Sequence, residues 1–168
     1  MLLSLLGKFA IGLVLGLGGI GSCLGIAAAG TAAAGAWSAE GKEGKTPSAR
    51  YILFVAAPLS QTFYAMIMMK YMAEIVHNVD NSLILFGFGL TCGVVELFSA
   101  MFQGRIGAAG IRCLNENGGK GFGNLILALG IIESVGLFAM VFTLYVITNP
   151  AFVVMGKAVE AVGATVGN

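Results

Sequence analysis

Residues 122–148 read FGNLILALGIIESVGLFAMVFTLYVIT, an apolar stretch with one acidic residue, Glu133, near its middle. A helix that crosses a hydrocarbon layer about 30 Å thick needs roughly 20 such residues, so this stretch is long enough to span a membrane. The alternation of apolar and polar residues typical of a membrane strand is absent. The stretch therefore predicts a transmembrane helix that carries a carboxyl group at membrane depth.

The rest of the chain follows the same pattern. Of the 168 residues, 58% are hydrophobic and 10% are charged, whereas a soluble domain has about 25% charged residues. A net charge of +1 argues against a nucleic-acid partner. We expect an all-α integral membrane protein with four transmembrane helices, near residues 9–36, 51–76, 82–112 and 122–148.

The two halves of the chain resemble each other. Three pairs of segments align, namely 32–35 with 107–110, 44–45 with 119–120 and 60–61 with 132–133. This internal similarity predicts two tandemly duplicated helical hairpins. The expected units are a first hairpin over residues 1–78, a second over 79–150 and a C-terminal tail over 151–168.

Lys and Arg are unevenly distributed over the connections between the helices. They occur around residues 38–50 and around residues 113–121, while the middle connection, 77–81, has none. Because short loops rich in Lys and Arg stay in the cytoplasm, we expect segments 38–50 and 113–121 to be cytoplasmic. Both termini then lie on the outer side.

Small residues recur every four positions in the first and third helices, as in Gly12/Gly16 and Gly89/Gly93. Such faces let helix backbones approach closely, which drives association in lipid. Two interpretations remain open: contact within one hairpin, or contact between copies. In the first helix, small residues cover most of the circumference between residues 16 and 36, which favours a ring of copies.

Polar side chains lie at the depth of Glu133 in the neighbouring helices. Gln61 and Gln103 lie at that level, and Ser60 and Tyr64 share a helix face with Gln61. A carboxylate surrounded by amide and hydroxyl oxygens suits a desolvated cation. A structural carboxylic acid, hydrogen-bonded between helices, is the alternative interpretation of the same residues.

Three motifs then carry a resemblance to a known family. They are PLSQTFY at residues 58–64, LFSAMFQG at 97–104 and Ile132-Glu133. With the four helices over roughly residues 9–149, they make the chain similar to the proteolipid subunit of V-type (V/A-type) rotary ATPases. This proteolipid is known as the K or c subunit, and the chain resembles most the bacterial sodium-translocating kind.

The resemblance implies an ion site and its ligands. The expected Na⁺ ligands are Glu133, Gln103, Gln61, Ser60 and the backbone carbonyl of Ala57, with Tyr64 locking the carboxylate; H⁺ is the alternative ion. The first hairpin has Gln61 where the second has Glu133, so each copy is expected to carry one ion.

The resemblance also implies partners and a mechanism. Copies of the chain are expected to form a rotor ring in a prokaryotic cell membrane, next to a stator subunit with an essential arginine and a central-stalk subunit. The ring carries ions across the membrane as it rotates, coupled to ATP hydrolysis or synthesis in other subunits, so the chain itself is not an enzyme.

One acidic residue departs from the family pattern. Glu96 stands where a small residue is expected, two helical turns from Gln103. It is interpreted as a hydrogen-bonding group between subunits, as a residue lining the centre of the ring, or as a second ionisable relay.

Three other functions stay open on the sequence. They are a small four-helix cation-coupled transporter, a rotor ring that carries only protons, and a purely structural membrane oligomer.

Overall fold

The computed structural model describes residues 2–76 and 82–149, and this part of the chain is helical without any strand. The elements are α1 (Leu2–Lys42), α2 (Arg50–Ala56), the 3₁₀ turn η1 (Ala57–Leu59), α3 (Ser60–Ile75), α4 (Ser82–Glu116) and α5 (Phe122–Ile147). Four spans within them are long and apolar enough to cross a membrane. The predicted all-α fold with four spans is confirmed, while the tail over 151–168 lies outside the described residues.

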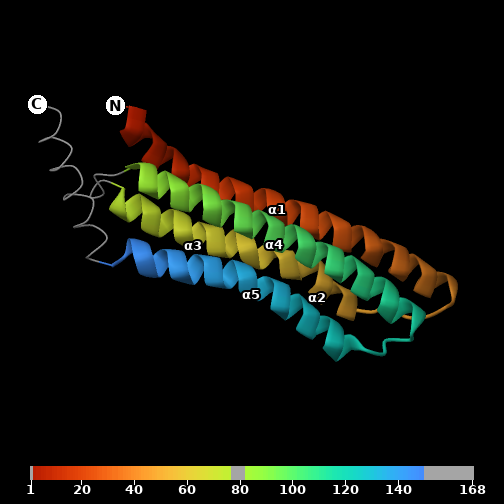
Figure 1. The fold of residues 1–168 in the computed structure, drawn as a ribbon. Helices are drawn as coiled ribbons and strands as arrows, with labels where there is room; N and C mark the ends of the chain where they lie inside the picture. Colours follow the sequence, from red (N-terminus) through yellow and green to blue (C-terminus); the bar gives the residue numbers. More distant parts are fainter. Residues whose placement is uncertain (1, 77–81, 150–168) are drawn as a thin grey trace, which may run out of the picture.

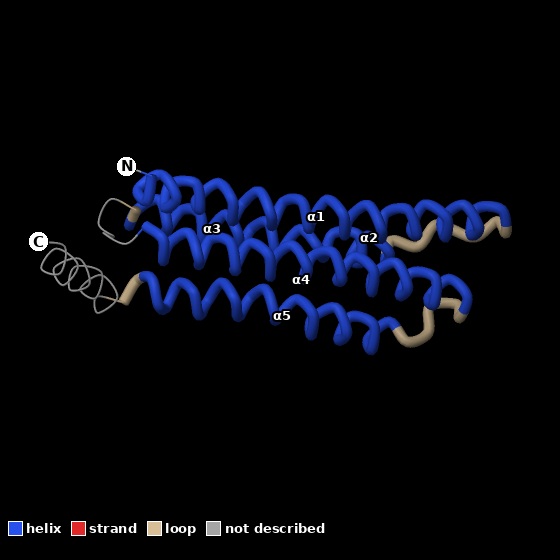
Figure 2. Tube along the Cα trace, turned by 45° about the horizontal axis from the view of Figure 1, so that its top comes forward, coloured by secondary structure: helices blue, strands red, loops and turns tan. Residues whose placement is uncertain are grey.

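The helices run side by side as one elongated bundle (Figure 1). Helix α1 contacts α4 more extensively than any other element. The segment α2–η1–α3 packs against both α1 and α4, whereas α5 packs against α4 and α3, as the turned view also shows (Figure 2). The connections after α1 and after α4 lie at the same end of the bundle. The division into two duplicated hairpins stays a prediction.

Glycines explain why α1 and α4 lie so close together. A Cβ atom added at Gly104 would overlap the backbone of Gly25, and one at Gly21 would lie 2.5 Å from the Cα atom of Leu97. The small-residue face of α1 is therefore used in part for contact with α4, between the two predicted hairpins. Added Cβ atoms would meet nothing within 4 Å at five other α1 glycines, namely Gly12, Gly16, Gly19, Gly35 and Gly41.

The central helices extend further than the apolar pattern predicts. Helix α1 spans 41 residues, which is about 60 Å at 1.5 Å per residue and exceeds the hydrocarbon thickness. The connections are shorter than the expected loops over 38–50 and 113–121, because residues 38–42 and 113–116 are helical. Polar residues can continue a helix into water, so the end of hydrophobicity does not mark the end of the helix.

Both central helices end with the same backbone motif. Gly44 has φ +70° and Gly118 has φ +62°. In each case the N–H of the next residue donates to the carbonyl five residues before it, at 2.9 Å and 2.7 Å respectively. This is a Schellman cap, which needs a residue at positive φ and so favours glycine. In the structure Gly44 therefore corresponds to Gly118, whereas the sequence alignment paired Gly44 with Gly119, one residue further on.

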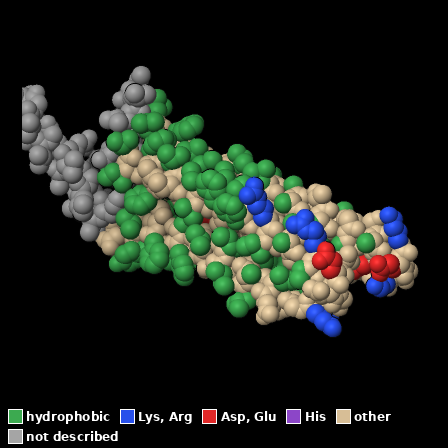
Figure 3. Space-filling model, turned by 45° about the vertical axis from the view of Figure 1, so that its right-hand side comes forward, with side chains coloured by type: hydrophobic (Ala, Val, Ile, Leu, Met, Phe, Trp, Pro, Cys, Tyr) green, Lys and Arg blue, Asp and Glu red, His purple; other side chains and the backbone are tan. Residues whose placement is uncertain are grey.

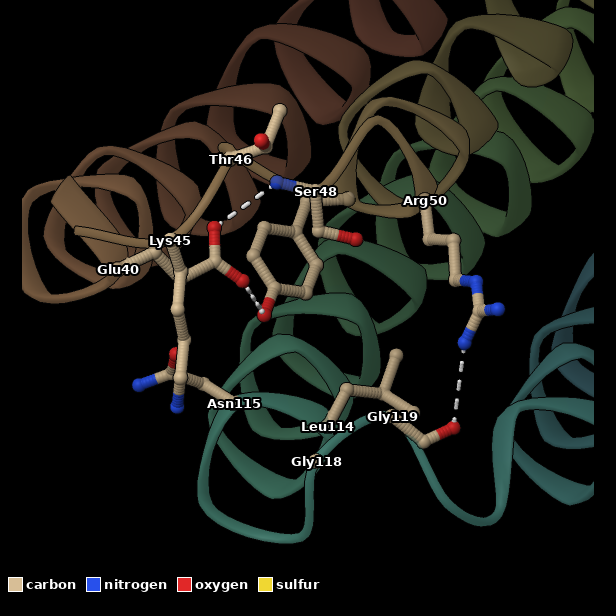
Figure 4. A pocket seen from close by; sticks show the side chains of 10 residues that line it. Glu40, Lys45, Thr46, Ser48, Arg50, Leu114, Asn115, Gly118 and Gly119 are labelled. Carbon is tan, nitrogen blue, oxygen red and sulfur yellow. Dashed lines mark hydrogen bonds between the residues drawn. The ribbon is translucent and has the colours of Figure 1, made fainter. Parts of the chain in front are cut away.

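Charged side chains gather at the end of the bundle where these connections lie (Figure 3). The Glu40 carboxylate accepts hydrogen bonds from the Tyr51 hydroxyl at 2.7 Å and from the Ser48 N–H at 2.8 Å. The Arg50 guanidinium donates to the Gly119 carbonyl at 3.5 Å, and both residues line a pocket between the two connections (Figure 4). These contacts join the two connections into one polar surface.

Candidate functional site

A proline turn positions the polar motif of the second span. Pro58 has no N–H and cannot continue the helical hydrogen-bond ladder, and α2 passes into α3 through the 3₁₀ turn η1. The Pro58 carbonyl accepts a hydrogen bond from the Ser22 hydroxyl at 2.6 Å, and the Ala57 carbonyl accepts one from the Ser60 hydroxyl at 2.9 Å. The turn is thus held by α1 on one side and presents Ser60 on the other.

Three helices converge on the Glu133 carboxyl group. The Tyr64 hydroxyl from α3 donates to Oε1 at 2.9 Å, and Nε2 of Gln103 from α4 donates to Oε2 at 3.3 Å. Gln103 is fully buried, and Glu133 is half-buried. The structure therefore brings together three of the residues that the sequence singled out, from three different helices.

A second polar group lies beside the first. Gln61 is fully buried; its Oε1 atom lies 3.1 Å from the Ser60 hydroxyl, and its Nε2 donates to the Ser99 hydroxyl at 3.1 Å. Ser60 and Tyr64 lie one helical turn apart on α3, so the Gln61 group lies next to the group around the carboxylate.

Ser99 is a member of this network that sequence reasoning missed. Its hydroxyl accepts from Gln61 and donates to the Ile132 carbonyl at 2.9 Å, directly before Glu133 in the chain. The available signal was its position inside the motif at 97–104, one helical turn before Gln103. Ser99 ties α3 and α4 to the part of α5 that bears the carboxylate.

The network offers one carboxylate and several neutral oxygens. No group of three or more His, Cys, Asp or Glu that could hold a metal occurs among residues 2–76 and 82–149. Oε1 of Gln103 is buried and has no hydrogen-bond partner in this part of the chain. Because the two ends of an amide differ only by a half-turn of the side chain, this oxygen can replace Nε2 beside the carboxylate. One negative charge among neutral oxygens matches a monovalent cation or a proton.

The position of Glu96 disagrees with two of the three interpretations given above, a hydrogen bond between subunits and a residue lining the centre of the ring. Its side chain is completely buried within the bundle. A side chain enclosed by its own chain reaches neither a neighbouring copy nor the centre of a ring, so those two interpretations are wrong. Helical periodicity had placed Glu96 on roughly the face of Gln103 without showing that α1, α3 and α5 all close over it.

Part of the second half of the sequence matches a model of a known protein family. Residues 86–146 match the family model of the C subunit of ATP synthase. The match covers most of α4 and α5, including Gln103 and Glu133, so this part of the chain is similar to the proteolipid c subunits. Members of that family are non-catalytic membrane proteins that translocate ions as oligomeric rotor rings. No curated protein matches the chain.

Proposed function

We propose that this chain is the ion-carrying component of the membrane rotor ring of a V-type rotary ATPase. Each copy binds one Na⁺ at Glu133, with Gln103, Gln61, Ser60 and the Ala57 carbonyl as oxygen ligands. As the ring rotates past a stator subunit, it takes the ion across the membrane, while other subunits perform the ATP chemistry. In this proposal the connections after α1 and α4 face the cytoplasm of a prokaryotic cell and meet the central stalk.

One observation supports this proposal above the others. The Glu133 carboxylate sits in the middle of an apolar span, and groups from α3 and α4 donate to its two oxygens. Ionisable residues within membrane spans are costly and usually functional. Tyr64 and Gln103 come from two different helices, and Ser60 and Gln61 supply further oxygens within one helical turn of Tyr64.

The mechanism follows from charge neutralisation. Two apolar side chains close to the site in sequence, Phe63 and Ile131, are 52% and 64% exposed on the chain, as expected of a surface against lipid or another copy. A Glu133 that holds a cation is neutral and can pass through such surroundings. An empty Glu133 is an anion that needs a positive partner in a low-dielectric medium, a role that we assign to the stator arginine.

Carbodiimide labelling of the purified ring tests the proposal. Carbodiimides modify protonated carboxyl groups in apolar surroundings, and Na⁺ held by Glu133 blocks the reaction. We expect labelling of Glu133 at neutral pH to fall as the Na⁺ concentration rises, and K⁺ at equal ionic strength to have less effect. Labelling that ignores Na⁺ but is suppressed by raising the pH would favour the ring that carries only protons.

The mass of the assembly in mild detergent separates the remaining functions. A closed ring of many copies supports the rotor, because continuous rotation past a stator needs a succession of identical sites. A dimer would instead favour the cation-coupled transporter. A closed ring whose Glu133→Gln variant transports ions normally would favour a structural oligomer.

A further inference from the structure

The Glu96 carboxyl group has an unusual environment that the proposed ion site does not use. Its side chain is fully buried, and neither Oε1 nor Oε2 has a hydrogen-bond partner among the described residues. Buried polar groups are nearly always hydrogen-bonded, and an isolated ionised carboxylate is far too costly to bury. The neighbouring helices therefore meet the volume of this side chain rather than its hydrogen-bonding atoms.

Its surroundings are shaped to receive a side chain of this length. A Cβ atom added at Gly136 on α5 would lie 2.6 Å from Oε2 of Glu96. On the opposite side, a Cβ atom added at Gly18 on α1 would lie 3.6 Å from the Cβ atom of Glu96 and 2.7 Å from that of Ala65 on α3. The carboxyl group thus fills the space that the missing side chain of Gly136 leaves, and α1 approaches the base of the same side chain at Gly18.

This contact lies next to the proposed ion site. Gly136 follows Glu133 by three residues, so the two are neighbours on the surface of α5. The same added Cβ atom at Gly136 would lie 3.3 Å from the Ser99 hydroxyl, which donates to the Ile132 carbonyl. The separation of α4 and α5 at Gly136 therefore affects where Glu133 lies relative to Gln103.

We propose that Glu96 is a positioning residue whose side-chain volume, seated against Gly136, sets the spacing of α4 and α5 beside the ion site. This inference rests on the proposed role of Glu133 as the ion-binding residue. Glu96 contacts no ion itself, and its acidic group is dispensable as long as a side chain of similar length fills the space. The pair Glu96 and Gly136 acts on ion binding through the position of Glu133.

The test compares variants of the whole ring by the Na⁺ concentration that half-protects Glu133 from carbodiimide. Glu96→Met keeps the length of the side chain without the acid, since Met is unbranched and fills irregular gaps. Gly136→Ala crowds the carboxyl group, and Glu96→Ala with Gly136→Ala removes that crowding. Gly130→Ala is the matched control on α5, because an added Cβ atom there meets nothing within 4 Å.

We expect Glu96→Met and Gly130→Ala to stay within about threefold of the unmodified ring. Gly136→Ala is expected to raise the half-protecting Na⁺ concentration by roughly 10- to 100-fold, the usual effect of disturbing a group that orients a metal ligand. The double variant is expected to recover most of that loss, because contacting residues are energetically coupled. If Gly136→Ala forms no ring, a double variant that forms the ring again also supports the contact between Glu96 and Gly136.

Two results overturn the inference. One is a Glu96→Met ring of normal mass whose protection is as weak as that of Gly136→Ala, which would assign an acid or relay role to Glu96. The other is a Gly136→Ala ring that behaves like Gly130→Ala. If Na⁺ fails to protect the unmodified ring, the sodium proposal fails instead. The variants are then compared by the pH at which labelling of Glu133 falls to half. The inference requires this pH to differ from that of the unmodified ring in Gly136→Ala and to be unchanged in Glu96→Met.

Discussion

Replacing Tyr64 by Phe removes one hydroxyl group and leaves the aromatic ring of the side chain in place between α3 and α5. The hydroxyl donates to Oε1 of Glu133 at 2.9 Å, and Tyr64 is only half-buried, so the missing atom leaves little cavity. The substitution therefore isolates the hydrogen bond that, in our account, holds the carboxylate in its ion-binding position.

The expected loss follows from the type of hydrogen bond. A hydrogen bond to a charged group contributes about 1.5–3 kcal/mol. At about 1.4 kcal/mol for each factor of ten in affinity, this is roughly 10- to 150-fold. Because a bound cation neutralises part of the carboxylate charge, we expect the lower end, a loss of about tenfold in Na⁺ affinity.

The assay is the half-protecting Na⁺ concentration in the carbodiimide reaction of purified rings. Tyr71→Phe is the control, since Tyr71 lies on α3 two turns further along and is 39% exposed. We expect Tyr64→Phe to need about ten times more Na⁺ and Tyr71→Phe to need the same amount as the unmodified ring. Equal values for both variants would refute the idea that the phenol locks the site.

Two further predictions concern the contacts around the site. Gly104→Ala places a Cβ atom against the Gly25 backbone, so α1 and α4 have to separate, at a cost of about 1–3 kcal/mol for overpacking. Thermal dissociation of the ring in detergent is expected at a lower temperature than for Gly41→Ala, where the added atom meets nothing within 4 Å; equal temperatures would contradict the close contact. Ser99→Ala leaves the buried Gln61 amide without its acceptor. We expect ring formation with Na⁺ protection weakened about tenfold, and unchanged protection would show that Ser99 does not orient the site.

The sequence was sufficient for the spans and for part of the site. Four apolar stretches interrupted by polar connections give four membrane helices, because the hydrocarbon thickness sets their length. Glu133, Gln103 and Tyr64 were singled out because polar side chains at membrane depth are costly. Their equal depth on neighbouring helices was enough to predict that they meet.

Other features depend on contacts that a single sequence does not specify. Helical periodicity shows which residues share a face, but it does not show how closely α1 and α4 approach at Gly25 and Gly104. It also does not show that Glu96 packs against Gly136 or that Ser99 contacts Gln61 and Ile132. The ends of α1 and α4 were misplaced for another reason, since their Schellman caps lie in the polar segments beyond the hydrophobic stretches.

The stoichiometry of Na⁺ binding to the purified ring tests the central claim most directly. Equilibrium binding of radioactive Na⁺ is measured against the amount of chain, for the unmodified ring and for Glu133→Gln. We predict one Na⁺ per chain that Glu133→Gln abolishes, because this site supplies a single carboxylate for the ion. An unmodified ring that binds no Na⁺, or a Glu133→Gln ring that still binds one per chain, would contradict the account.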